Sequence, residues 1–220
     1  MNCNVVATGS SGNCVILNDS IAIDMGVPYK RVAPCVKVLR LVLLTHQHRD
    51  HFKPETIRRL AQERPALRFG CCAWMIRPLV EAGVEARSID VYDLEKSYTY
   101  GSMDLSAFPL VHDVENCGYK LNMDGEQAIY ATDTFTLEGI AAPGFDLYMI
   151  EANFTDAEIA ERIQRKLGAG AFVYEYRAAA GHLSREKADA WLAENTVPGK
   201  SKVVYLHGHR EDKRCGITSP

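Results

Sequence analysis

Short apolar runs separated by tight turns dominate the hydrophobic pattern of the chain. A run of apolar or alternating residues that is bounded by Gly, Asn, Asp or Ser is typical of a β-strand. By this criterion strands are predicted at residues 5–6, 15–17, 21–24, 38–44, 67–72, 88–94, 105–111, 119–123, 128–131, 147–150 and 202–206. The first three form a meander, and the run 38–44 is typical of a strand that is covered on both faces.

Helical periodicity recurs between these strands. Apolar residues three or four positions apart predict helices over 55–62 and 74–82. Thr155 and Ser184 are side chains that favour the N-cap position, so they are expected to open helices that reach Leu167 and about Glu194. Meander strands followed by strand–helix units indicate layered sheets with helices outside. Because no repeat or flexible linker interrupts the chain, we expect a single domain over residues 1–220.

The composition excludes several classes of protein. No stretch is apolar for long enough to span a membrane, and the first residues lack the basic start and apolar core of a secretion signal. We therefore expect a cytoplasmic protein with no membrane partner. The formal net charge of −3 gives no overall attraction to a polyanion, so any contact with nucleic acid needs a local patch.

Three of the seven histidines lie close together, directly after the apolar run 38–44. They are His46, His48 and His51, with Asp50 among them. Because alternate residues of an extended chain point to one side, His46 and His48 can converge on one ion while Asp50 and His51 turn toward a second. Imidazole and carboxylate ligands without thiolate favour Zn²⁺, with Mn²⁺ or Fe as alternatives. The other interpretation is a solvated polar loop.

At positions 45–51 the chain carries T-H-Q-H-R-D-H, which is similar to the T-H-x-H-x-D-H signature of the metallo-β-lactamase-fold hydrolases. The resemblance implies a fold that combines α/β and α+β features, a four-layer αββα sandwich. It also implies two divalent metal ions on loops at one edge of the paired sheets. Further matches to the family's ligand order extend the resemblance from Asp24 to His207.

The resemblance implies a complete ligand set. It assigns His46, His48 and His112 to one ion, Asp50, His51 and His207 to the second, and Asp133 to the position between them. Asp24 would orient a ligating imidazole by accepting its other N–H group. Without the resemblance, Asp24 and Asp133 could be turn residues and His112 a surface or core histidine. His209 has the same parity as His207 and is the alternative terminal ligand.

Two further segments resemble motifs of ribonuclease Z and related nucleases. They are E-A-N-F, which begins at Glu151, and G-H-L-S, which begins at Gly181. In those relatives the histidine, here His182, is a proton donor that the glutamate supports, and a carboxylate favours the protonated form of an imidazole that donates to it. With Asp50, these two form the expected catalytic set. Alternatively, His182 only flanks the helix that begins at Ser184.

Two other features indicate which branch of the family the chain resembles. The turn G-S-S-G-N-C at 9–14 resembles the start of small bacterial and phage exonuclease-like members, although it could be a simple hairpin turn. The interval from His112 to Asp133 is too short for the tRNA-gripping arm that ribonuclease Z carries there. Processing of tRNA is therefore not expected.

The function expected from these residues is that of a metal-dependent hydrolase. The principal hypothesis is a dinuclear-metal phosphodiesterase or nuclease that acts on DNA or RNA through a hydroxide bridging the two ions. The first alternative is a hydrolase of a small ester, thioester, lactone or cyclic nucleotide, because one fold hosts many chemistries. The second is a non-catalytic binding module in which metal only stabilises the fold.

Two clusters of basic residues could contact a nucleic acid. Each could equally be a solvated face, since acidic residues are interspersed. The first cluster contains Arg58, Arg59, Arg64 and Arg68, and the second contains Arg162, Arg165 and Lys166.

Overall fold

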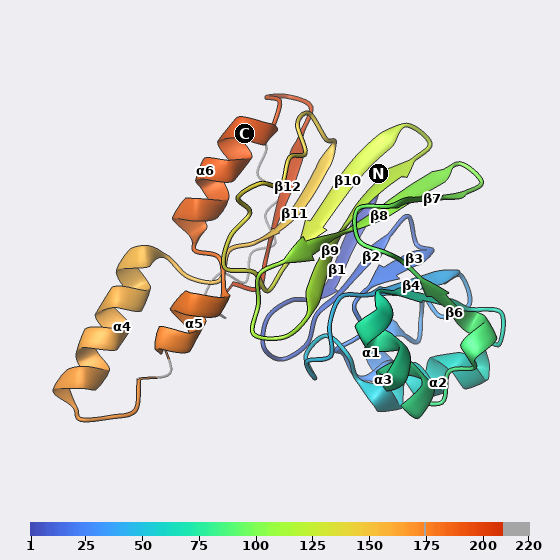
Figure 1. The fold of residues 1–220 in the computed structure, drawn as a ribbon, viewed down its shortest axis with the longest axis horizontal. Coiled ribbons are helices and arrows are strands. Elements are labelled where there is room, and N and C mark those ends of the chain that lie inside the picture. Colours follow the sequence, from blue (N-terminus) through green and yellow to red (C-terminus); the bar gives the residue numbers. More distant parts are fainter. Residues whose placement is uncertain (174, 209–220) are drawn as a thin grey trace. The chain divides into compact units, whose positions relative to one another are not determined.

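The computed structural model describes residues 1–173 and 175–208 (Figure 1). The chain divides into two units, Met1–Pro109 and Leu110–Pro220. The expectation of one domain over residues 1–220 stays a prediction. In the described residues no helix has the length and apolar character that crossing a bilayer requires.

A mixed sheet forms the centre of the first unit. Its strands are, in spatial order, β1 (Cys3–Ala7), β2 (Cys14–Leu17), β3 (Ile21–Ile23), β4 (Leu41–Leu44), β5 (Arg68–Cys71) and β6 (Ile89–Val91). The first three pair antiparallel, which confirms the predicted meander, and β3 to β6 pair parallel. Every residue of β2 and β4 is buried, as expected for strands that are covered on both faces.

Helices cover the sheet of the first unit (Figure 1). Their bounds are α1 (Tyr29–Val32), α2 (Pro54–Glu63), η1 (Ala73–Met75), α3 (Ile76–Glu81) and η2 (Ala86–Ser88). Pro54 occupies the start of α2, where its missing N–H costs nothing. Ile57 and Leu60 of this helix belong to the same buried cluster as Val42 and Phe69 of the sheet. The unit also contains an antiparallel hairpin of β7 (Ser97–Tyr100) and β8 (Met103–Leu110).

The second unit contains an antiparallel hairpin that continues into a parallel sheet. Its strands are β9 (Asn116–Met123), β10 (Glu126–Ala131), β11 (Leu147–Glu151) and β12 (Lys202–Leu206). The first two pair antiparallel, and β10, β11 and β12 pair parallel. Its helices are α4 (Asp156–Gly168), α5 (Glu175–Gly181) and α6 (Arg185–Asn195), of which α6 packs against β11.

Both predicted helix starts in the second unit are confirmed. The Thr155 hydroxyl accepts the backbone N–H of Glu158, whose carboxylate accepts the N–H of Thr155 in return, so the two form a capping box. The Ser184 hydroxyl accepts the N–H of Lys187. These caps satisfy backbone donors that a helix leaves unpaired at its start.

Some boundaries differ from the sequence prediction. The run 38–44 begins its strand only at Leu41, because Val38 and Leu39 donate to the carbonyl of Cys35 in a turn. The predicted strand 88–94 is reduced to β6 by the short helix η2. The pattern did not predict α1, β7 or α5, which are too short for hydrophobic periodicity to reveal.

Gly26 lets the segment after β3 lie against the loop that follows β4. Met25 donates to the carbonyl of His51, and Gly26 donates to the carbonyl of Asn13. A Cβ atom on Gly26 would lie 1.7 Å from the carbonyl oxygen of Asp50 and 2.7 Å from the backbone nitrogen of His51. Only glycine fits this approach.

We therefore expect Gly26→Ala to destabilise the protein and to displace residues 50 and 51. Overpacking of this kind costs roughly 1–3 kcal/mol, which urea unfolding would measure as a lower free energy of unfolding. Gly168→Ala is the matched control, because a Cβ at this helical position meets nothing within 4 Å. The control should be neutral or slightly stabilising. Wild-type stability of Gly26→Ala would contradict the proposed close approach.

Candidate metal centre

The loop after β4 brings three histidines together in the first unit. The ring centroids of His46 and His48 are 4.8 Å apart, and those of His46 and His51 are 4.2 Å apart. Asp50 lies beside them, with its Oδ2 atom 3.8 Å from Nε2 of His51. His46 and His51 are fully buried. The first unit therefore holds the predicted cluster of imidazoles and carboxylate in one place.

The buried carboxylate of Asp24 orients two of these imidazoles. Its Oδ2 accepts from Nδ1 of His51 at 2.7 Å, while its Oδ1 accepts the backbone N–H and the hydroxyl of Thr45. Because the Thr45 proton is donated to Asp24, the Thr45 oxygen accepts from Nδ1 of His46, at 2.9 Å. Both rings thus carry their proton on Nδ1, which leaves Nε2 of each as the nitrogen able to bind a metal.

Asn13 is a residue of this cluster to which the sequence analysis gave no role. Its side chain is buried and its Oδ1 accepts the N–H of Gly9. Its Nδ2 lies 2.8 Å from Nε2 of His51 and 3.2 Å from the carbonyl of Asp50. A cation at His51 would replace the first of these contacts. The signal in the sequence was the turn 9–14, whose last polar residue reaches the histidine loop.

His112 belongs to the second unit, two residues after β8 ends at Leu110, and its ring orientation is fixed. Its Nδ1 donates to the carbonyl of Gly181 at 3.1 Å, which leaves Nε2 to face Asp133 Oδ2 at 3.7 Å and Asp113 Oδ1 at 3.2 Å. Burial holds the pKa of His112 below its ordinary value, although Asp133 acts in the opposite direction. A neutral imidazole is the form that binds metal.

A second buried carboxylate, Glu151, organises the remaining residues of this unit. Its Oε1 accepts from Nδ1 of His182 at 2.7 Å and from Nδ1 of His207 at 2.9 Å. Its Oε2 accepts the backbone N–H groups of Thr134 and Leu183. The hydrogen bonds to Glu151 connect the ends of β10, β11 and β12 and the start of α6.

Asp133 completes a set of four side chains in the second unit. Its Oδ1 lies 2.6 Å from Nδ1 of His207. Ligand atoms of Asp133, Glu151, His182 and His207 all lie within 4.8 Å of one another. The chemistry of this donor set fits a divalent cation of the zinc, manganese or iron type, because it combines imidazole nitrogen with carboxylate oxygen.

The electrostatics of these four residues are those of a site that attracts positive charge. Burial acts to raise the pKa of Glu151, but hydrogen bonds from His182 and His207 outweigh it and hold the pKa below its ordinary value. For His207 the directions are reversed. Burial acts to lower its pKa, but the charge and hydrogen bonds of Asp133 and Glu151 raise it to about 10. Two buried carboxylates therefore require cationic partners.

Three of the predicted residues adopt a left-handed backbone. Asp24, Asp133 and His207 have φ values of 60°, 55° and 59°. Each directly follows a strand or lies two residues beyond it, so the turn redirects the side chain at the strand end. Such conformations cost of order 1–3 kcal/mol for non-glycine residues and concentrate at functional sites.

The structure thus assembles the predicted residues in two groups. Asp24, His46, His48, Asp50 and His51 lie together in the first unit, and His112, Asp133, Glu151, His182 and His207 lie together in the second. The alternative terminal ligand, His209, lies outside the described residues. The assignment of individual residues to two ions stays a proposal.

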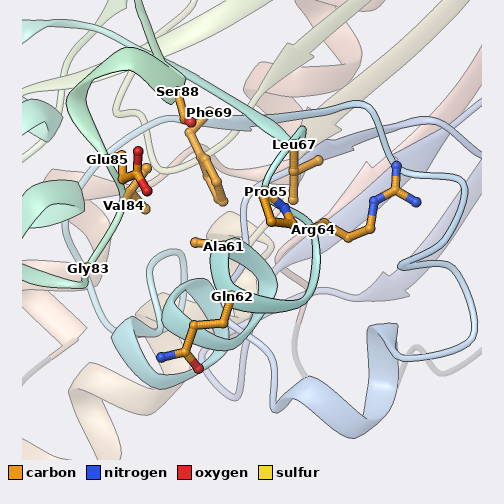
Figure 2. Close-up of a pocket in the computed structure, with 10 residues that line it drawn as sticks. All are labelled: Ala61, Gln62, Arg64, Pro65, Leu67, Phe69, Gly83, Val84, Glu85 and Ser88. Carbon is orange, nitrogen blue, oxygen red and sulfur yellow. The ribbon is translucent and has the colours of Figure 1, made fainter.

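A pocket beside α2 is distinct from the histidine loop of the first unit (Figure 2). Leu67, Phe69 and Val84 are among its lining residues, together with Arg64 and Glu85. None of its lining residues belongs to the predicted site. The guanidinium of Arg64 donates to the carbonyls of Lys37 and Leu39.

Other arginines of the first basic cluster also have partners within the unit. Arg59 pairs with Glu63 at 2.7 Å and lies over the ring of Tyr29, and Arg68 pairs with Asp90. These contacts account for three of the four arginines as an internally paired face, the alternative to phosphate binding.

Comparison with known proteins identifies relatives. A family model described as "Beta-lactamase superfamily domain" matches residues 23–207. The chain is 26% identical, over 233 residues, to exodeoxyribonuclease WalJ of Streptococcus pneumoniae serotype 2. That similarity covers 94% of this chain and 80% of the relative.

Two solved structures have a similar fold. The metallo-β-lactamase fold protein YhfI of Bacillus subtilis matches with a TM-score of 0.70 and 14% identity, over 94% of this chain and 85% of YhfI. The short form of human tRNase Z matches with a TM-score of 0.70 and 14% identity, over 96% of this chain and 94% of the enzyme. These similarities confirm the predicted fold class, the αββα sandwich.

The hydrogen bonds of Asp24 predict how its loss affects metal binding. Asp24→Asn replaces an anionic acceptor by an amide, so His51 loses the partner that fixes its proton on Nδ1. We expect zinc affinity to fall roughly 10- to 100-fold in competition with a chromophoric chelator. Asp90→Asn is the control, because Asp90 pairs with Arg68 in the same sheet, away from the histidines. Unchanged affinity in Asp24→Asn would contradict the orienting role.

Proposed function

We propose, from the premise that the chain belongs to the β-lactamase superfamily, that it is a two-metal phosphodiesterase that cleaves DNA. The observation that carries the proposal is the hydrogen bond between buried Glu151 and His182, next to Asp133 and His207. This arrangement places an imidazole that can donate a proton close to residues suited to holding a metal. The similarity to an exodeoxyribonuclease along 94% of the chain supports DNA over RNA.

The residues proposed to hold the two ions follow the ligand order of the family. We assign His46, His48 and His112 to one ion, and Asp50, His51 and His207 to the other, with Asp133 as ligand to both. Two bound cations would supply a water of lowered pKa as nucleophile and would neutralise charge that develops on the phosphate. Zinc is the favoured metal, and manganese and iron are the alternatives.

The chain itself supplies orientation around this centre. Asp24 fixes His51 directly and His46 through Thr45, so that Nε2 of each ring points away from these partners. Gly181 does the same for His112 through its carbonyl. Ligands that are held in advance lose little conformational entropy when they bind, which favours a site of fixed geometry.

His182 is proposed to donate a proton to the departing oxygen. Its Nδ1 donates to Glu151, which leaves Nε2 as the atom that delivers a proton. The Glu151 side chain has no exposed surface, whereas 20% of the His182 side chain is exposed, so the ring can reach a substrate that the carboxylate cannot. Glu151 therefore positions His182 and also accepts from His207. A cytoplasmic location is part of this proposal.

The proposal predicts different effects for Asp133 and His182. Asp133→Ala should lose bound metal and all cleavage of end-labelled DNA, because a shared ligand is removed. His182→Ala should keep its metal, as measured by elemental analysis, but cleave DNA roughly 10²- to 10⁴-fold more slowly. With bis-p-nitrophenyl phosphate the loss should be smaller, because p-nitrophenolate leaves without needing a proton.

Asp189→Ala removes an exposed carboxylate of α6 that pairs with Arg185 and should leave metal content and cleavage unchanged. Full DNA cleavage by His182→Ala would exclude the proton-donor role. The nuclease proposal itself fails if metal-loaded wild type cuts single-stranded DNA, duplex DNA, RNA and bis-p-nitrophenyl phosphate no faster than His48→Ala does.

A further inference from the structure

The helices α4 and α5 form an arm of the second unit, defined here as residues 155–173 and 175–181. Figure 1 shows α4 leading away from the sheet of this unit and α5 returning toward it. The base of the arm is closed by two backbone hydrogen bonds, from Asn153 to Leu183 and from Arg185 to Phe154. At the far end Lys166 pairs with Glu175 at 2.8 Å, which holds the two helices together.

Large hydrophobic side chains are exposed where α4 ends and α5 begins. Phe172 is 83% exposed, the highest value for a large hydrophobic residue in the described chain, and Tyr176 is 55% exposed. Leu167, in the last turn of α4, is 51% exposed. An apolar group of this kind on an extended element indicates a binding surface.

Positive charge accompanies these aromatic residues. Arg165 is exposed and makes no ion pair among the residues that the structure describes, whereas Arg162 is half-buried and its charge acts on Glu175. The other basic residues of the arm are engaged, since Lys166 pairs with Glu175 and Arg177 with Asp113. The end of the arm therefore offers aromatic rings and the guanidinium group of Arg165, together with Arg162, whose charge Glu175 partly balances.

We infer that the end of the arm binds single-stranded nucleic acid, with bases stacked on Phe172 and Tyr176 and phosphates held by Arg162 and Arg165. Aromatic platforms beside basic residues are the means by which proteins bind unpaired strands. Attraction to an anionic membrane would require clusters of about four to eight basic residues, whereas three of the four basic residues of the described arm interact with acidic partners. The charge of the arm thus matches a short length of strand better than a lipid surface.

The arm also leads to the proposed catalytic group. The carbonyl of Gly181, the last residue of α5, accepts from His112, and His182 follows directly. With a helical rise of about 1.5 Å per residue, Tyr176 is roughly 9 Å from His182 along the axis, about three nucleotides of a stacked strand. This inference rests on the proposed nuclease function. It assigns to the enzyme a substrate with an unpaired end.

Binding to a labelled strand tests the inference. We would measure the fluorescence anisotropy of a fluorescein-labelled oligothymidylate with phosphorothioate linkages, which slow cleavage, on the metal-loaded protein. Phe172→Ala and Tyr176→Ala should each weaken binding roughly 5- to 150-fold, the range for loss of one stacked base. Phe172→Trp should retain binding, because tryptophan keeps the stacking face. A duplex of the same sequence should bind more weakly than the single strand and respond little to the variants.

Matched controls separate stacking and charge from general effects. Tyr100→Ala removes a partly exposed aromatic side chain from β7 and should leave binding unchanged. Arg165→Ala should reduce the slope of log affinity against log salt by about one, whereas Arg77→Ala should not, since Arg77 pairs with Glu81 on α3. Thermal unfolding should show all variants folded, because these side chains are exposed.

Two outcomes would overturn the inference. One is wild-type affinity for the single strand in the Phe172→Ala, Tyr176→Ala double variant. The other is binding of anionic phospholipid vesicles that depends on Phe172 while binding of the oligonucleotide does not. If the arm variants lose binding but wild type cleaves no strand, the nuclease proposal fails and the inference about the arm stands. If wild type cleaves DNA and the arm variants bind it fully, only the inference about the arm fails.

Discussion

In the first unit a carboxylate with no exposed surface, Asp24, fixes the protons of two imidazoles. Burying a charge is costly unless hydrogen bonds replace its hydration, and here three donors from Thr45 and His51 do so. Glu151 has the same role in the second unit, where two backbone N–H groups and two imidazoles donate to it. The position of each histidine therefore depends on a carboxylate that need not touch the substrate.

Backbone strain also occurs at residues of the proposed metal centre. Asp24, Asp133 and His207 take left-handed conformations directly after or near the ends of strands, where an ordinary turn would direct their side chains elsewhere. Hydrogen bonds and ion pairs offset the cost. Asp24 is held through Thr45 and His51, Asp133 through His207, and His207 through both Asp133 and Glu151. Asp and His are among the residues that tolerate this conformation best, so ligand chemistry and backbone geometry select the same residue types.

Sequence reasoning predicted the strands that carry these residues because each ends an apolar run, and it predicted α4 and α6 because their caps are local signals. It could not give the role of Asn13, whose contact with His51 joins positions far apart in the chain. Nor could it find α5, a short alanine-rich segment without apolar spacing. The start of β4 was misplaced because Val38, an exposed residue in a turn, has the same hydropathy as a buried one.

The arginines show why composition cannot decide function. Both basic clusters looked alike in the sequence, with acidic residues nearby in each. In the first unit Arg59, Arg64 and Arg68 are engaged by side chains and carbonyls that folding brings close. On α4 the Glu158 carboxylate closes the capping box at the first turn, whereas the last turn contains Arg165 and Lys166. Whether an arginine can attract phosphate thus depends on whether folding has paired it with a carboxylate. Such pairing is a property of tertiary structure.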